Sequence, residues 1–142
     1  MTQRIRREPE ESRMNGQCVR LPVTVLLVAD DDRVRDGLRR PLERSGEVHV
    51  VAAATLRDDV AGLVRCYAPD VVLLDMLGQD CRVLALCREV AREVPVLVLS
   101  AYLTPAEWHE AEAAGAAGFH LKTIGIGDLV RKVEAVSAAR RP

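Results

Sequence analysis

Short apolar runs alternate along this chain with longer segments in which apolar residues recur every three or four positions. The runs predict strands buried on both faces, and the spaced segments predict amphipathic helices. Five strands are expected, at residues 23–29, 48–52, 71–74, 96–99 and 119–121. Each is followed by an expected helix, at about 33–44, 55–64, 82–92, 104–114 and 129–136. Because such crossovers are right-handed and place helices on the faces of the sheet, the pattern predicts a doubly wound α/β domain with a five-stranded parallel sheet.

Local signals predict where these helices begin and end. Residues 104–107, Thr-Pro-Ala-Glu, combine an N-cap, a first-turn proline and a glutamate at the third helical position. Thr55 followed by Asp58 predicts a similar start for the second helix. Pro41 interrupts the first helical pattern. Because proline inside a helix costs about 3 kcal/mol, we expect that helix to bend or end near Arg40.

The composition restricts the class of protein. The 142 residues are 49% apolar, enough for one packed core, and the net charge of -1 argues against general attraction to nucleic acid or an anionic membrane. Residues 1–21 are polar and arginine-rich, so we expect a disordered leader before a domain at 22–142. Because no apolar run has the length of a membrane span and no secretion signal is visible, a cytoplasmic location is expected.

Polar residues stand at the carboxyl ends of the expected strands. Asp30 and Asp31 follow the first strand, and Asp75 follows the third. Ser100 ends the fourth strand and Lys122 ends the fifth. Because the carboxyl ends of parallel strands meet at one edge of a sheet, where ligands bind, we expect these five side chains to form one site.

These residue types suit phosphoryl transfer. Carboxylates from two strands are ligands that Mg²⁺ prefers, together with water and a phosphate. Asp75 can then form an aspartyl-phosphate, since a metal offsets the incoming charge. Lys122 would supply a cation for one phosphoryl oxygen, and Ser100 a hydroxyl donor for another. A simpler role stays open for the acids at 30–32, which can cap the first helix.

Four segments resemble the receiver domain of bacterial two-component response regulators, a CheY-like domain. The segments are Val28–Asp31, Pro69–Asp75, Val98–Tyr102 and Ala114–Lys122. They occur in the family's order, at strand ends, within a region from about residue 23 to about residue 137. The resemblance implies a flavodoxin-like (βα)5 fold with strand order 2-1-3-4-5, and a signalling switch that changes a partner-binding surface when it is phosphorylated.

The resemblance also implies the phosphoacceptor and its metal ligands. Asp75 is implied to receive the phosphoryl group and to contact Mg²⁺. Asp31 is implied to bind Mg²⁺ directly, Asp30 to act partly through water, and the backbone carbonyl of Leu77 to complete the metal site.

The remaining implied roles concern the switch. Ser100 and Lys122 are implied to contact the phosphate, and Phe119 to be the aromatic residue that moves inward when Ser100 follows the phosphate. Phe119 as an ordinary core residue is the simpler alternative.

Two departures from the family's pattern keep a second function open. The loop after Asp75, residues 76–80, is shorter than usual, although it should offer the metal-binding carbonyl. The turn after the acidic pair is also short, so Asp31 and Asp32 are an alternative working pair. The alternative function is a phosphorylation-independent receiver that acts as a protein-interaction or dimerisation module.

The expected partners follow from the phosphoacceptor function. A histidine kinase or phosphotransfer protein would donate the phosphoryl group, and an unidentified protein would be the downstream target; a homodimer is compatible with either function. No membrane partner is expected. Few residues follow Val136, so DNA binding is expected only if an output domain belongs to a longer chain.

Other enzyme classes fit poorly, and beyond its own phosphotransfer and dephosphorylation we do not expect the chain to be an enzyme. Acids replace the glycine-rich turn that a dinucleotide enzyme needs after the first strand. A haloacid-dehalogenase-like phosphatase would need an acid at position 77, where the chain has leucine.

Overall fold

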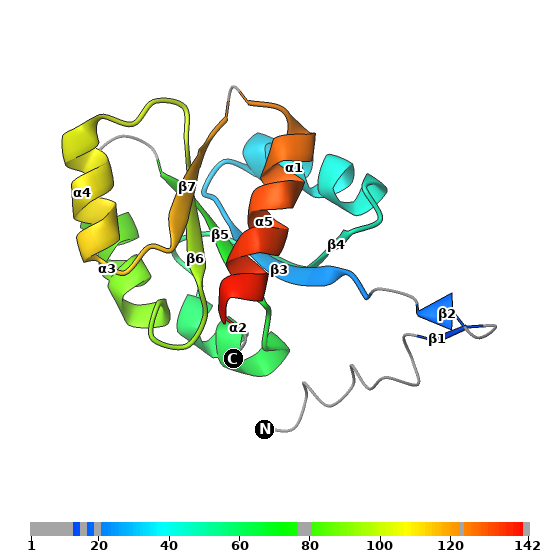
Figure 1. The fold of residues 1–142 in the computed structure, drawn as a ribbon. Helices are drawn as coiled ribbons and strands as arrows, with labels where there is room; N and C mark the ends of the chain where they lie inside the picture. The colour runs from blue at the N-terminus through cyan, green and yellow to red at the C-terminus, as the bar shows by residue number, and fades with distance from the viewer. Residues whose placement is uncertain (1–12, 15–16, 19–20, 77–80, 123, 141–142) are drawn as a thin grey trace.

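The computed structural model describes residues 13–14, 17–18, 21–76, 81–122 and 124–140. In these residues the main feature is a sheet of five parallel strands in the spatial order β4-β3-β5-β6-β7 (Figure 1). The strands are β3 (Val23–Val28), β4 (Val48–Ala54), β5 (Val71–Met76), β6 (Val96–Ser100) and β7 (Gly118–Leu121). Counted within the sheet, the order is 2-1-3-4-5, which confirms the predicted topology.

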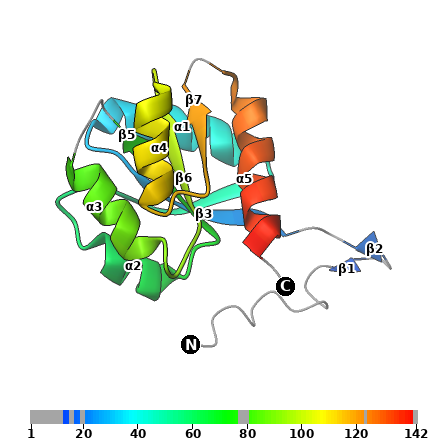
Figure 2. The same ribbon diagram turned by 60° about the vertical axis from the view of Figure 1, so that its left-hand side comes forward.

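Helices cover both faces of this sheet. α1 (Asp32–Arg44) and α5 (Ile126–Arg140) lie on one face, while α2 (Val60–Tyr67), α3 (Cys81–Val90) and α4 (Pro105–Ala113) lie on the other (Figures 1 and 2). Successive strand residues point to opposite faces, so each central strand contributes to two cores. None of the helices in the described segments is long and apolar enough to cross a bilayer.

The centre of the sheet is β5, where all six residues are buried. Val71 and Leu73 pack in the core under α1 and α5, and Val72 and Leu74 pack in the core under α2, α3 and α4. This two-sided burial explains the unbroken apolar run in the sequence. It also fixes Asp75 at the carboxyl end of the strand.

The first helix continues through Pro41, so of the predicted bend or end near Arg40, the ending is wrong. α1 runs to Arg44, and Leu42, directly after the proline, is completely buried. Burying a leucine contributes about 1.5–3 kcal/mol, which offsets much of the cost of the proline. The carbonyl that loses its hydrogen bond belongs to Gly37, four residues earlier on the exposed side of the helix, where water can replace it.

The second helix begins later than predicted. Thr55 and Asp58 do hydrogen-bond, with the Thr55 backbone N–H donating to Oδ2 of Asp58 at 2.8 Å, but they form a turn before the helix. The actual N-cap is Asp59, whose Oδ1 accepts a hydrogen bond from the Gly62 N–H at 3.0 Å. With the start shifted, Val60 and Val64 still face the core.

The start of α4 agrees with its prediction. The Thr104 hydroxyl accepts from the Glu107 N–H at 3.1 Å, and the Glu107 carboxylate accepts from the Thr104 N–H at 2.9 Å. The complete capping box, with proline at the first helical position, fixes the start of α4 at Pro105.

Before the domain, Arg13–Met14 (β1) and Gln17–Cys18 (β2) form a two-residue antiparallel pair that the sequence did not predict. Most of residues 1–21 lie outside the described residues. The disordered leader and the domain boundary at residue 22 therefore stay predictions.

Candidate functional site

Three of the predicted polar side chains lie at the carboxyl ends of neighbouring strands. Asp75 is in β5, opposite Leu99 of β6, and the next pair in this register is Met76 and Ser100. Lys122 directly follows β7, and its backbone N–H donates to the Ser100 carbonyl at 2.8 Å. The sheet register therefore brings the acid, the hydroxyl and the amine to one edge.

The centre of the site is an ion pair between the Lys122 ammonium and Oδ1 of Asp75. The Asp75 side chain is only 1% exposed, whereas that of Lys122 is 24% exposed. Oδ1 of Asp75 is buried and accepts no hydrogen bond from the described residues, so Lys122 is its counter-ion in this part of the structure. A buried carboxylate without its cation is strongly unfavourable, and the pair therefore depends on the position of Lys122.

Asp30 and Asp31 also lie at this edge, but each carboxylate already has partners. Oδ1 of Asp30 accepts from the Leu56 backbone N–H at 2.8 Å, and Oδ2 lies 3.7 Å from the Arg82 guanidinium. Asp31 is the N-cap of α1, and its Oδ1 accepts from the Arg33 N–H at 2.8 Å. This hydrogen bond, together with the Arg33 guanidinium 3.4 Å away, holds the pKa of Asp31 below its usual value.

These contacts decide whether the predicted Mg²⁺ ligands form a metal site. The residue types and their strand ends suit Mg²⁺, but the orientations do not, since both carboxylates of the acidic pair face peptide N–H groups and guanidinium groups. Within the described ranges, no three acidic, histidine or cysteine side chains are grouped so that they could hold a metal ion. Leu77, the predicted carbonyl ligand, lies outside the described residues. Asp32, the alternative acid, is exposed in the first turn of α1.

Ser100 and Phe119 have contacts of their own. Ser100 is buried, and its hydroxyl donates to the Tyr102 carbonyl at 2.7 Å while accepting from the Tyr102 N–H at 3.2 Å. The Phe119 ring is partly buried and lies 4.9 Å from the Trp108 ring, centroid to centroid. Lys132 donates to the Phe119 carbonyl at 2.7 Å, with its Nζ 5.2 Å from the ring centroid.

A buried histidine next to the site was not predicted. His120 is 2% exposed, and its Nε2 lies 3.2 Å from the Ile124 carbonyl. Because a carbonyl only accepts, Nε2 carries the proton, and the buried Nδ1 has no partner among the described residues. The hydrogen bond joins β7 to the chain beyond Lys122, which helps to fix the lysine. In the sequence, the only signal was a polar residue between the apolar Phe119 and Leu121.

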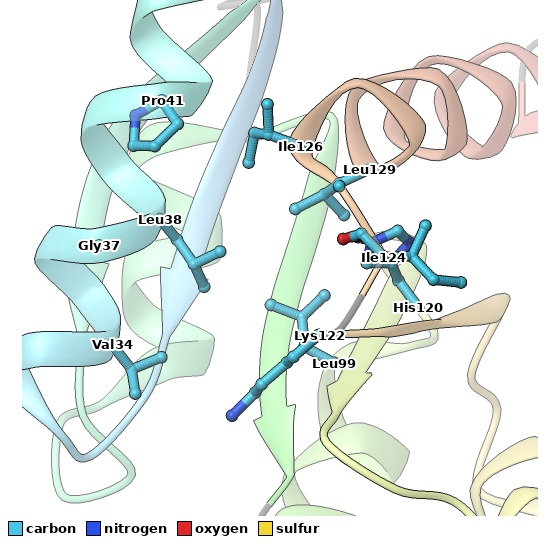
Figure 3. Close-up of a pocket in the computed structure, with 11 residues that line it drawn as sticks. Val34, Gly37, Leu38, Pro41, Leu99, His120, Lys122, Ile124, Ile126 and Leu129 are labelled. Atoms are coloured by element: carbon cyan, nitrogen blue, oxygen red, sulfur yellow. Dashed lines mark hydrogen bonds between the residues drawn. The ribbon is translucent and has the colours of Figure 1, made fainter.

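A cavity of about 380 Å³ lies between α1 and the start of α5, beside His120. Val34, Leu38 and Pro41 form one wall, and Ile126 and Leu129 form the other (Figure 3). The Lys122 ammonium points away from Ile126 and Leu129 (Figure 3), and it forms the ion pair with Asp75.

This architecture, a doubly wound five-stranded domain with a polar site at the strand ends, is that of a receiver domain. The family model of the response regulator receiver domain matches residues 25–134, and the chain belongs to this family. The probable transcriptional regulatory protein NarL of Mycobacterium tuberculosis is 38% identical over 117 residues, which are 79% of this chain and 54% of that protein. The DNA-binding transcriptional activator DevR/DosR of the same organism is 34% identical, over 83% of this chain and 56% of that protein. This chain thus spans about half the length of these curated relatives.

Solved structures agree with this assignment. The signal receiver domain of the putative response regulator NarL from Mycobacterium tuberculosis has a TM-score of 0.71 and 36% identity, covering 85% of this chain and 100% of that one. The response regulator ChrA of a heme-sensing two-component system has a TM-score of 0.68 and 32% identity, covering 86% of this chain and 60% of that one. The response regulator domain of Thermotoga maritima CheB, at 19% identity and a TM-score of 0.70 over 85% of this chain and 99% of that one, shows the same fold.

Proposed function

We propose that this receiver domain is a phosphoacceptor switch in which Asp75 receives a phosphoryl group from a histidine kinase or phosphotransfer protein. The observation that carries the proposal is the buried Asp75 carboxylate, paired with Lys122 at the carboxyl edge of the sheet. Its location at the strand ends is the usual place for chemistry in an open α/β sheet. The expected cytoplasmic location is part of the proposal.

In the proposed transfer, an Asp75 carboxylate oxygen attacks the phosphorus of a phosphohistidine in the donor. The phosphorus–nitrogen bond breaks, and the imidazole leaves with its electron pair and takes up a proton. Lys122 then exchanges the carboxylate for a phosphoryl oxygen, so one cation serves both states. The predicted Mg²⁺ stays a prediction, because Asp30 and Asp31 would first have to exchange their present partners for the ion.

The switch in this proposal begins at Ser100. Its hydroxyl, now held by the backbone of Tyr102, would leave Tyr102 and donate to the phosphoryl group. Tyr102 is 75% exposed, so the released segment belongs to the surface that a partner would contact. Phe119 lies under the neighbouring helix against Trp108, and a change of its rotamer would move the α4 side of the domain. The downstream protein would distinguish these two surface states.

A second function is favoured by a specific observation, the acidic pair that is already occupied by hydrogen bonds and arginines. In this alternative the domain binds a protein partner, or a second copy of itself, without phosphorylation. Partner binding would then be the same for Asp75→Ala and for the unmodified protein.

The two functions are separated by exposing the protein to a small phosphodonor, with and without Mg²⁺, and measuring the intact mass. The phosphoacceptor function predicts the mass of one added phosphoryl group, absent in Asp75→Asn and retained in the control Asp70→Asn, which changes the other buried acid of the β5 region. A wild-type mass that stays unchanged under both conditions would exclude this function. Equal labelling of wild type and Asp75→Asn would exclude Asp75 as the acceptor.

A further inference from the structure

We propose that the acidic pair Asp30 and Asp31 is a structural latch in this chain, with the guanidinium groups of Arg33 and Arg82 occupying the positions that a divalent cation would need. The family fold implies a Mg²⁺ ion between this pair and Asp75, and the observed contacts disagree with that expectation. The latch does not depend on whether Asp75 is phosphorylated.

Asp30 joins three segments at the edge of the sheet. Its Oδ1 holds the turn after β4 through the Leu56 N–H, and its Oδ2 faces Arg82 in the first turn of α3. Its backbone carbonyl accepts from the Arg35 guanidinium of α1 at 3.1 Å, and the same Arg35 nitrogen donates to the Ala29 carbonyl at 2.5 Å. The residue therefore has a role in the structure without any metal.

Arg82 explains why Asp30 is needed there. A cation in the first turn of a helix lies at the positive end of the helix dipole, which disfavours it. Asp30 offsets this charge from the neighbouring strand end. A divalent cation bound to the same carboxylate would place two positive charges against the guanidinium, so Mg²⁺ has to displace Arg82 before it binds.

Both carboxylate oxygens of Asp31 also have partners within the protein. One of its oxygens caps α1, and the other lies 3.4 Å from the Arg33 guanidinium. N-capping by an aspartate stabilises a helix, and the short turn between β3 and α1 puts Asp31 in the cap position. Metal binding would therefore compete with the Arg33 side chain for the second oxygen.

The test is a Mg²⁺ titration of the full chain by calorimetry, without a phosphodonor. Removing both guanidiniums, in Arg33→Ala with Arg82→Gln, should lower the apparent Kd by about tenfold, because two partly exposed ion pairs no longer compete with the ion. The backbone N–H of Arg33 is unchanged in this variant, so the cap remains. Arg82→Lys with Arg33 retained, and the control Arg88→Gln on α3, should bind Mg²⁺ as weakly as wild type.

The proposal is overturned if the double variant binds Mg²⁺ no more tightly than wild type, including the case in which neither binds. A stability measurement in the presence of a chelator tests whether Asp30 stabilises the fold without a metal ion. Asp30→Ala should raise the unfolding equilibrium constant about fivefold, since the Leu56 N–H loses its acceptor, whereas Asp36→Ala on the exposed side of α1 should not. If the acidic pair were instead an empty metal site, Asp30→Ala should lower the unfolding equilibrium constant, because removing one of two adjacent carboxylates relieves their repulsion. Neither readout involves phosphorylation, so a failure here is distinct from a failure of Asp75 as phosphoacceptor.

Discussion

Two buried aspartates lie at opposite ends of the same central strand, and their surroundings differ in kind. Asp70 precedes β5 and is 3% exposed, and Asp75 near its end is 5% exposed. Asp70 accepts hydrogen bonds from the Thr24 N–H at 2.9 Å and the Thr24 hydroxyl at 3.1 Å. Asp75 instead faces the Lys122 ammonium, with an oxygen that no hydrogen bond from the described residues satisfies.

The difference shows which acid is structural and which is suited to chemistry. The hydrogen bonds of Asp70 join the amino ends of β3 and β5, where the Asp70 N–H also donates to the Thr24 carbonyl at 2.9 Å. Hydrogen bonds from a backbone N–H and a hydroxyl to one carboxylate oxygen join two segments of the chain and stabilise the fold. A buried carboxylate whose counter-ion is the partly exposed Lys122 keeps an oxygen available for a new bond, at a cost in stability.

Of the substitutions near these two aspartates, removal of the Lys122 ammonium should change stability most. Lys122→Met leaves the Asp75 carboxylate buried without a counter-ion, and we expect the free energy of unfolding to fall by about 3 kcal/mol. Chemical denaturation measures the change. Adding Asp75→Asn to this variant should restore most of the loss, because no buried charge then remains. A double variant that is no more stable than Lys122→Met would show that the ion pair is not the reason.

A smaller loss of stability is expected for a substitution at the amino end of β5. Asp70→Ala leaves the Thr24 N–H and hydroxyl without this acceptor and should lower the free energy of unfolding by about 2 kcal/mol. Thr24→Val, which keeps the N–H bond to Asp70, should cost less. Phosphoryl labelling of Asp75 should be unchanged in folded Asp70→Ala. Loss of labelling there would mean that the two acids are not functionally separate.

The smallest effect concerns the exposed acidic pair and is visible only in acid. The pKa of Asp31 is lowered in the folded state, chiefly by the hydrogen bond from the Arg33 N–H. Its contribution to stability is therefore present above the ordinary carboxyl pKa, near pH 4, and is lost as the pH falls through the lowered value. Between these pH values, the stability of Asp31→Asn should fall less steeply than that of wild type in denaturation experiments. Parallel pH profiles would contradict this assignment.

The sequence predicted that Asp75 and Lys122 lie at the same edge of the sheet, because strand ends alone place these two residues. An apolar run that ends at Asp75, and another that ends before Lys122, suffice once both strands are parallel members of one sheet, with only β6 between them. The capping box of α4 followed from an equally local pattern, whereas the strand order was implied by the resemblance to receiver domains.

Other features depend on contacts between distant segments, which no local pattern contains. The α1 helix continues past Pro41 because Leu42 packs on the sheet. The partners of Asp30 come from the turn after β4 and from α3. The run of three acids in the sequence therefore could not show that the Asp30 carboxylate contacts Leu56 and Arg82. His120 was missed for the same reason, since its partner is set by the path of the loop to α5.

Whether Asp75 is the phosphoacceptor is tested most directly by identifying the phosphorylated residue chemically. After treatment with a small phosphodonor, borohydride reduces an aspartyl-phosphate to homoserine, and peptide sequencing by mass spectrometry locates the converted position. Homoserine is expected at position 75 alone, with none at positions 30, 31 or 70. Conversion at any of those three positions, or at none of the four, would contradict this expectation.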